Sequence, residues 1–206
     1  MNKTIIACLT ALALPAIGCS TAAPATPDTQ ATEVQGGIYS DQCITEQEVV
    51  AAQRAWGEGI VKIGKVHDSG GDSTQAAMEH INKFYGYDQS LVLFKPTLAS
   101  VDQFRASFDG ALSYFVGGNP SYPEDKGFAL KTWSSVRWEN TGIVNNSCTM
   151  AVAMGNYFFQ PSAGGDEVKV EYTIGYIKDS NNDLRMIVHK STIPYAPPAD
   201  TANAGE

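Results

Sequence analysis

An α+β domain is predicted for this 206-residue chain by three features of its sequence. The first folded segments repeat apolar residues at helical spacing, and the last segments alternate apolar with polar residues as strands do. Short turn-forming stretches separate these later segments. Helices followed by an antiparallel meander indicate N-terminal helices packed on one face of a strongly curved, mostly antiparallel sheet.

Helical segments come first. Thr45 and Glu48 form a capping box ahead of a long amphipathic run, which Gly64 is expected to end. A second helix is expected after the turn "HDSGG", with an apolar stripe that extends to Tyr85. A shorter helix is expected within residues 106–118, where two glycines stop it.

Strands dominate the second half of the folded region. An isolated strand is expected at the sequence "LVLFKPT", where Pro96 ends it. Beyond it the turn signals "NN", "PSAGGD" and "SNND" divide the chain into four segments joined by hairpins, at 127–144, 147–160, 167–179 and 184–193.

The N-terminus has the features of a secretory signal. Lys3 precedes an apolar run that is too short for a permanent membrane span, so residues 1–19 are predicted to be a signal peptide. The sequence "AIGC" resembles a lipobox and makes Cys19 a candidate for lipidation; ordinary cleavage near Ala22 or Ala23 is the alternative. We therefore expect an exported protein: periplasmic, anchored to the outer membrane as a lipoprotein, or secreted.

Composition sets the domain limits and excludes some partners. Residues 20–40 are rich in Ala, Thr and Pro and read as a flexible tether, residues 41–197 as one domain, and residues 198–206 as a disordered tail. A formal net charge of −8 argues against a nucleic-acid partner and leaves a lipid anchor as the expected membrane contact.

Two cysteines remain in the domain. Cys43 and Cys148 can form a disulfide in an oxidising compartment, or they can be two separate buried thiols. They lack the CxxC spacing of a zinc site, and no dinucleotide, Walker or HExxH motif is present, so neither a metal nor a cofactor is expected.

Several segments of the sequence resemble proteins of one superfamily. The stretches "ALSYFVGGNPSYPEDKGFALKTWSSVRWENTGIV", "AMGNYFF", "VKVEYTIGY" and "HKSTIPY" are similar to NTF2-like, or SnoaL-like, proteins. The closest resemblance is to bacterial secreted proteins related to the association domain of calcium/calmodulin-dependent protein kinase II. It implies a cone of helices on a bent sheet, a pocket between them, and a homodimer or higher homo-oligomer.

Two residues on the expected strands are candidate ligand contacts. His189 would donate a hydrogen bond in the pocket, or it is a structural residue of the last strand. Arg137 shares a strand face with Glu139 and would hold a carboxylate if that face is concave. If the face is exposed, the two residues form surface ion pairs of little energetic value.

Other candidates follow from local context. Lys95 lies between apolar neighbours and either faces the pocket mouth or extends to water. Asp125, in the loop "YPEDKG", is a weak candidate for a catalytic acid or base, because acids in loops are usually solvated. His189 is a second weak candidate for the same role. Trp133, Tyr172 and Tyr176 would line the pocket with aromatic surface.

Three functions fit these features. The leading prediction is a domain that binds a small, anionic organic ligand in its pocket and self-associates through its sheet. The first alternative is a cofactor-independent isomerase, dehydratase or cyclase of the kind found in the superfamily. The second alternative is an oligomeric scaffold, because fold alone does not decide function.

Overall fold

The computed structural model describes residues 43–145 and 147–197. The predicted signal peptide with its lipidation site, the tether and the C-terminal tail lie outside these described residues. Within the described part of the chain, none of the helices has the length and apolar character of a bilayer-spanning segment.

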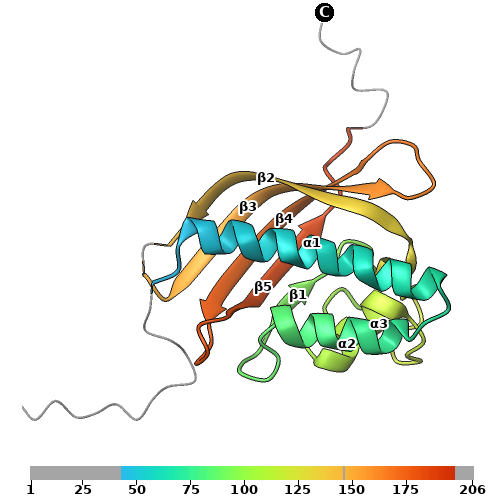
Figure 1. Ribbon diagram of the computed structural model, residues 1–206, viewed down its shortest axis with the longest axis horizontal. Helices are drawn as coiled ribbons and strands as arrows, with labels where there is room; N and C mark the ends of the chain where they lie inside the picture. Colours follow the sequence, from blue (N-terminus) through green and yellow to red (C-terminus); the bar gives the residue numbers. More distant parts are fainter. Residues whose placement is uncertain (1–42, 146, 198–206) are drawn as a thin grey trace, which may run out of the picture. The chain divides into compact units, whose positions relative to one another are not determined.

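Three helices pack on a five-stranded mixed sheet, which confirms the predicted α+β class (Figure 1). Helix α1 crosses one face of the sheet, and α2 and α3 lie together beside it (Figure 1). The elements, in chain order, are α1 (Glu46–Asp68), α2 (Ser73–Phe84), β1 (Leu93–Lys95), α3 (Phe108–Val116), the 3-10 helix η1 (Phe128–Leu130), β2 (Trp133–Val144), β3 (Met150–Pro161), β4 (Val168–Lys178) and β5 (Leu184–Thr192).

The sheet has the strand order β1-β5-β4-β3-β2. Strands β2 to β5 form the predicted antiparallel meander, whereas β1 pairs in parallel with β5 and places Phe94 opposite His189. A register shift at Gly175 and Tyr176 of β4 gives β5 one extra residue. As a result Met186 and His189, three positions apart, are both buried, although strict alternation would place them on opposite faces.

Helix α1 begins as predicted but ends later. The Thr45 hydroxyl accepts the Glu48 amide hydrogen, and the Glu48 carboxylate accepts the Thr45 amide hydrogen at 2.7 Å, which completes the capping box. The prediction that Gly64 ends this helix is wrong, because α1 continues to Asp68. Gly64 instead permits close packing: a Cβ atom there would lie 3.2 Å from the Ala129 carbonyl oxygen.

The core lies between the helices and the inner face of the sheet. Helix α1 contributes Trp56, Ile60 and Ile63, and the strands contribute aromatic and aliphatic residues such as Tyr157 and Ile174. The largest fully buried side chains include Trp56, Arg105, Tyr85, Tyr172, Tyr176, Phe115 and Phe159. Several of these side chains carry polar groups, so this core must satisfy hydrogen bonds as well as bury apolar surface.

A disulfide joins Cys43 and Cys148, whose Cα atoms are 4.2 Å apart. It links the start of α1 to the start of β3 across 105 positions of sequence. In the chain-entropy model, closing a loop of about this length stabilises the fold by up to about 5 kcal/mol.

We therefore expect the Cys43→Ser/Cys148→Ser double variant to lose about 3 to 5 kcal/mol of unfolding free energy. Urea denaturation with and without a phosphine reductant measures this loss. The reductant should lower the midpoint of the wild type and leave that of the double variant unchanged. Equal midpoints for the oxidised wild type and the double variant would contradict the prediction.

Candidate functional site

A buried polar cluster surrounds His189 between the helices and the sheet. The His189 side chain is 2% exposed, and its Nδ1 atom lies 2.8 Å from the Tyr85 hydroxyl. Its Nε2 atom lies 3.5 Å from the Tyr157 hydroxyl. The rings of Phe94 and Trp56 pack against the imidazole at centroid distances of 5.1 and 5.6 Å, which excludes solvent from most of its surface.

Tyr157 is the centre of this cluster. Burial raises the pKa of the Tyr157 hydroxyl, and the neighbouring side chains of Ser191 and Thr97 partly oppose that rise. Ser191 is 3% exposed, whereas Thr97 is half-buried and lies nearest to the surface. We call His189, Tyr85, Tyr157, Ser191 and Thr97 the His189 cluster.

The local sequence explains how these side chains converge. Tyr85 was predicted on the second helix, but α2 ends at Phe84 and Tyr85 is extended, which turns its ring into the core. Tyr157 is an inner-face residue of β3. Thr97 follows β1, whose parallel pairing with β5 brings this loop beside His189 and Ser191.

Burial keeps the imidazole of His189 neutral. Desolvation lowers its pKa to about 3. A second buried histidine, His80, also has a pKa lowered to about 3, mainly by desolvation and further by Lys83 and His189. Both ring nitrogens of His80 are buried without a hydrogen-bond partner among the described residues.

The two buried histidines should make the folded state less stable in acid. In the unfolded chain a histidine has a pKa of about 6.5, so the unfolded state binds protons that the folded state does not. Stability is therefore full above about pH 6.5 and is lost as the pH falls toward 3. Each histidine should contribute about 1.4 kcal/mol per pH unit within that window.

Urea unfolding between pH 7 and pH 5, above the range where most carboxylates titrate, measures this slope. We expect His80→Asn to be less stable than the wild type at pH 7 but to lose about 1 kcal/mol less per pH unit on acidification. His67→Gln, at the exposed end of α1, is the control. Parallel pH profiles for wild type and His80→Asn would disprove a buried neutral His80.

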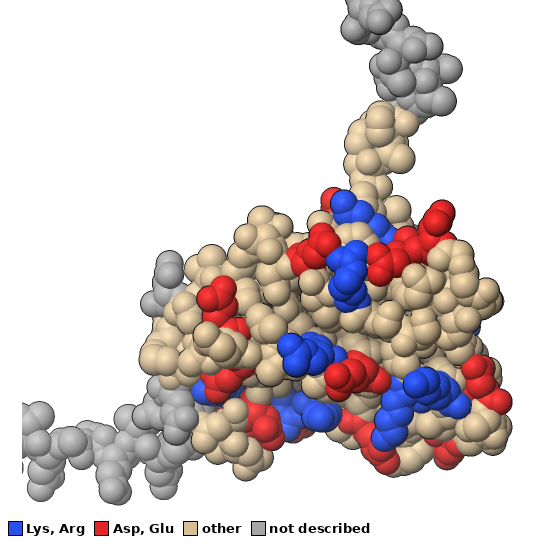
Figure 2. Space-filling view, turned by 45° about the horizontal axis from the view of Figure 1, so that its top comes forward, with Lys and Arg blue, Asp and Glu red and all other residues tan. Residues whose placement is uncertain are grey.

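Arg137 lies outside the cluster. Its side chain is 46% exposed, forms ion pairs with Glu139 and Glu167, and lies over the Phe158 ring at 3.9 Å. The predicted pocket role therefore does not fit, because this strand face points to solvent. Side chains of both charges lie beside one another on the molecular face shown in Figure 2.

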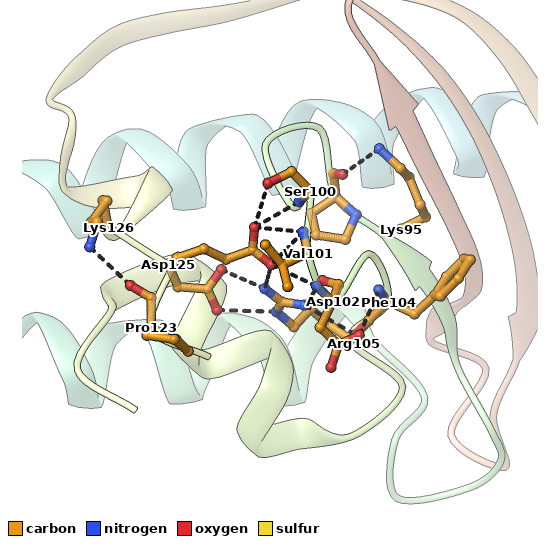
Figure 3. Close-up of polar contacts among 11 residues, drawn as sticks. Lys95, Ser100, Val101, Asp102, Phe104, Arg105, Pro123, Asp125 and Lys126 are labelled. Atoms are coloured by element: carbon orange, nitrogen blue, oxygen red, sulfur yellow. Dashed lines mark hydrogen bonds and ion pairs between the residues drawn. The ribbon is translucent and has the colours of Figure 1, made fainter. Parts of the chain in front are cut away.

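Lys95 and Asp125 also make structural contacts. The Lys95 ammonium donates a hydrogen bond to the Pro96 carbonyl at 3.0 Å, at the start of the loop that carries Thr97. Asp125 is buried, but its carboxylate accepts two hydrogen bonds from Arg105, at 2.7 and 3.1 Å (Figure 3). An acid held in this way is a poor candidate for proton transfer, because its lone pairs are already engaged.

The three predicted aromatic residues are all buried. Tyr172 lies on the inner face, where its hydroxyl bonds Asn140 and accepts a hydrogen bond from Gln53 at 3.2 Å. Tyr176 is also buried on that face, and Trp133 donates to a backbone carbonyl within the core. Of the three, Tyr172 packs against Tyr157 of the cluster at a centroid distance of 5.3 Å.

Sequence reasoning selected His189 but missed Tyr85 and Thr97 as its neighbours. Tyr85 was interpreted as one position of an apolar stripe, and Thr97 was given no role after Pro96, the predicted end of the strand. Tyr85 and His189 are 104 positions apart. The available signal was Pro96, which ends the strand and so leaves Thr97 in the following loop.

A surface cleft elsewhere does not include the cluster. It has a volume of about 740 Å³ between α1 and β2 and is lined by charged residues of both signs, including Arg54, Glu58 and Lys62. These side chains extend toward solvent from a helix face. Among the described residues, no group of three or more His, Cys, Asp and Glu side chains is arranged to hold a metal ion.

Comparison with known proteins identifies relatives of this chain. The family model described as "Metal-independent carbonic anhydrase" matches residues 47–193. A metal-independent carbonic anhydrase from Nostoc sp. (strain PCC 7120) is 43% identical over 158 residues, which are 75% of this chain and 76% of the relative.

One solved structure agrees with this match. A crystal structure of the iota-carbonic anhydrase from a cyanobacterium, complexed with bicarbonate, is 41% identical and has a TM-score of 0.73; the match covers 80% of this chain and all of that chain. An NTF2-like protein from Shewanella oneidensis MR-1 is 13% identical with a TM-score of 0.46, over 71% of this chain and 97% of the other.

These findings correct the functional prediction. The sequence resemblance named the NTF2-like superfamily and its kinase-association group, not the family that matches. The predicted organic-ligand domain and both alternatives, the isomerase-type enzyme and the scaffold, are wrong, because the 43% identical relative is a carbonic anhydrase. The error arose because the resemblance supported a fold that hosts many functions.

Proposed function

Because the chain belongs to the metal-independent carbonic anhydrase family, we propose that it catalyses the reversible hydration of CO₂ to bicarbonate in the His189 cluster. In this reaction a water oxygen bonds to the carbon of CO₂, one C=O π bond opens, and the attacking water loses a proton to the surrounding buffer, so that CO₂ and water give bicarbonate and a proton. Negative charge develops on the oxygens derived from CO₂, so hydrogen-bond donors there accelerate the reaction.

The observation that carries this proposal is the convergence of hydroxyl groups on Tyr157. Tyr157, Ser191 and Thr97 each carry a hydroxyl that can donate to an oxygen of CO₂ or bicarbonate. Burial shields these hydroxyls from bulk solvent and strengthens such bonds, because the local dielectric is low. The crystallised cyanobacterial relative is complexed with bicarbonate, the product of this reaction.

The neighbouring bonds orient these donors. Trp56 can only donate, and its Nε1 atom lies 3.2 Å from the Tyr85 hydroxyl. Tyr85 then has its own proton available for Nδ1 of His189, which leaves the His189 proton on Nε2, facing Tyr157. The Tyr157 oxygen can accept that hydrogen bond and keep its own proton for the substrate.

This arrangement favours charge stabilisation over strong base catalysis. A histidine with a pKa of about 3 accepts a proton weakly near neutral pH. Neutral donors suit a site that must release its anionic product, because a fixed cation would hold bicarbonate more tightly.

A CO₂ hydration assay tests the proposal. Purified protein, followed by the fall in pH after mixing with CO₂-saturated water, should hydrate CO₂ faster than buffer alone. The rate should be unchanged after dialysis against a chelator, as the family description implies. A rate equal to the buffer blank over the pH range 6.5 to 9 would overturn the proposal.

We also propose that the protein self-associates through the outer face of its sheet. Met154 is 54% exposed there, and Glu171 and Lys190 beside it can form reciprocal ion pairs across a two-fold axis. Light scattering of the purified protein should give a mass above that of one chain, and Met154→Glu should reduce it. A monomeric mass for the wild type would refute this proposal.

Export is proposed on the signal sequence alone. The intact mass of protein recovered from cells distinguishes acylation at Cys19 from cleavage near residue 22. An N-terminus at Met1 in the mature protein would refute export through this signal.

A further inference from the structure

The loop between β1 and α3 carries Thr97 and is held mainly by polar contacts. Its large apolar side chains do not anchor it: Leu98, Val101 and Phe104 are 51%, 88% and 60% exposed, and only the small Pro96 and Ala99 are buried. A loop that buries so little apolar surface needs another source of order.

Glu124 supplies much of that order. Its carboxylate accepts the backbone amide hydrogens of Ser100 at 2.8 Å, Val101 at 3.0 Å and Asp102 at 3.0 Å. It also accepts the Ser100 hydroxyl at 2.8 Å. Figure 3 shows these three residues gathered around one carboxylate. Consecutive amides directed at one anion fix the backbone of the segment.

Arg105 fastens the far end of the same loop. Its guanidinium is fully buried, bonds Asp125 and lies 3.5 Å from Glu124. Its backbone amide donates to the Phe94 carbonyl at 2.8 Å, and its carbonyl accepts the Tyr87 hydroxyl at 2.7 Å. The loop is therefore bound at its middle by a carboxylate and at its end by a buried ion pair.

Thr97 lies at the near end of this loop. The β1/β5 register, with Lys95 opposite Lys190, places Thr97 beside the end of β5 that carries Ser191. The Thr97 side chain also lowers the pKa of the Tyr157 hydroxyl. We propose that Glu124 is a positioning residue for CO₂ hydration: by ordering residues 100–102 it keeps the Thr97 hydroxyl against Tyr157. This inference rests on the proposed function, and it goes beyond it because Glu124 does not contact the His189 cluster.

A double-mutant cycle tests the inference. Glu124→Gln keeps the size of the side chain but removes its charge and half of its acceptor capacity. We expect kcat/KM to fall about 10- to 100-fold, since small misplacements of reacting groups cost this much. Thr97→Val should be at least as slow, and the double variant should be no slower than Thr97→Val, because both changes remove the same contact. Glu139→Gln, in an exposed ion pair on β2, is the matched control.

Amide hydrogen exchange gives a reading that does not depend on activity. In Glu124→Gln, exchange should accelerate at Thr97 and Leu98, which do not contact Glu124, as well as at residues 100–102. Multiplicative losses in the cycle, or unchanged exchange at Thr97, would overturn the inference. If the wild type fails to hydrate CO₂, the proposed function fails, and exchange at Thr97 still decides whether Glu124 orders this loop.

Discussion

Tyr157→Phe is expected to lower kcat/KM for CO₂ hydration by about 10²- to 10³-fold, because it removes the hydroxyl at the centre of the His189 cluster. The ring should stay in place, since it stacks on Trp138 at 4.9 Å and packs against Tyr172 at 5.3 Å. The loss should therefore be one of chemistry and not of folding. Stopped-flow measurement of CO₂ hydration provides the comparison.

Tyr195→Phe is the control for this variant, because Tyr195 is 83% exposed beyond β5. Its rate should equal that of the wild type. Circular dichroism and thermal melting of Tyr157→Phe should show a folded protein. A Tyr157→Phe rate within threefold of the wild type would show that this hydroxyl does not act in the reaction.

Arg105→Ala is expected to lower the free energy of unfolding by about 3 to 5 kcal/mol. The Arg105 and Asp125 side chains are 0% and 2% exposed, so removal of the guanidinium leaves a buried carboxylate without its partner. Burial of an uncompensated charge is among the most destabilising single changes. Urea denaturation followed by tryptophan fluorescence measures the loss.

Arg137→Ala is the matched comparison, because Arg137 also pairs with two carboxylates but lies on the surface. We expect it to cost far less than Arg105→Ala, because exposed ion pairs contribute little to stability. A double variant, Arg105→Met/Asp125→Leu, should be more stable than Arg105→Ala because no buried charge remains unpaired. Similar losses for Arg105→Ala and Arg137→Ala would contradict this account.

The contrast between these two arginines shows where sequence reasoning fails. Arg137 was chosen because it alternates with apolar residues on a strand, and alternation is visible in the sequence. Alternation does not reveal which strand face is covered by helices. Arg105 lies in a loop without periodicity, and its partner Asp125 is 20 positions away, so no local pattern joined them.

The candidate site was predictable only in part, because most of its residues are distant from one another in the sequence. His189 was noticed as a polar residue in a β-rich run. Its partners come from the end of α2, the loop after β1 and the inner face of β3. The parallel pairing of β1 with β5 and the bulge at Gly175 bring them together, and both depend on packing between distant segments.

Local pattern was sufficient for the class of fold, the capping box of α1 and the four-strand meander, because helix caps, turns and side-chain periodicity involve residues close in sequence. The tertiary structure alone decided that Gly64 packs closely instead of ending a helix, that Arg137 faces solvent, and that Thr97, Tyr157 and Ser191 share one buried site. Those outcomes depend on which surfaces meet when the chain folds, and contacts across 32 and 104 positions leave no periodic trace in the sequence.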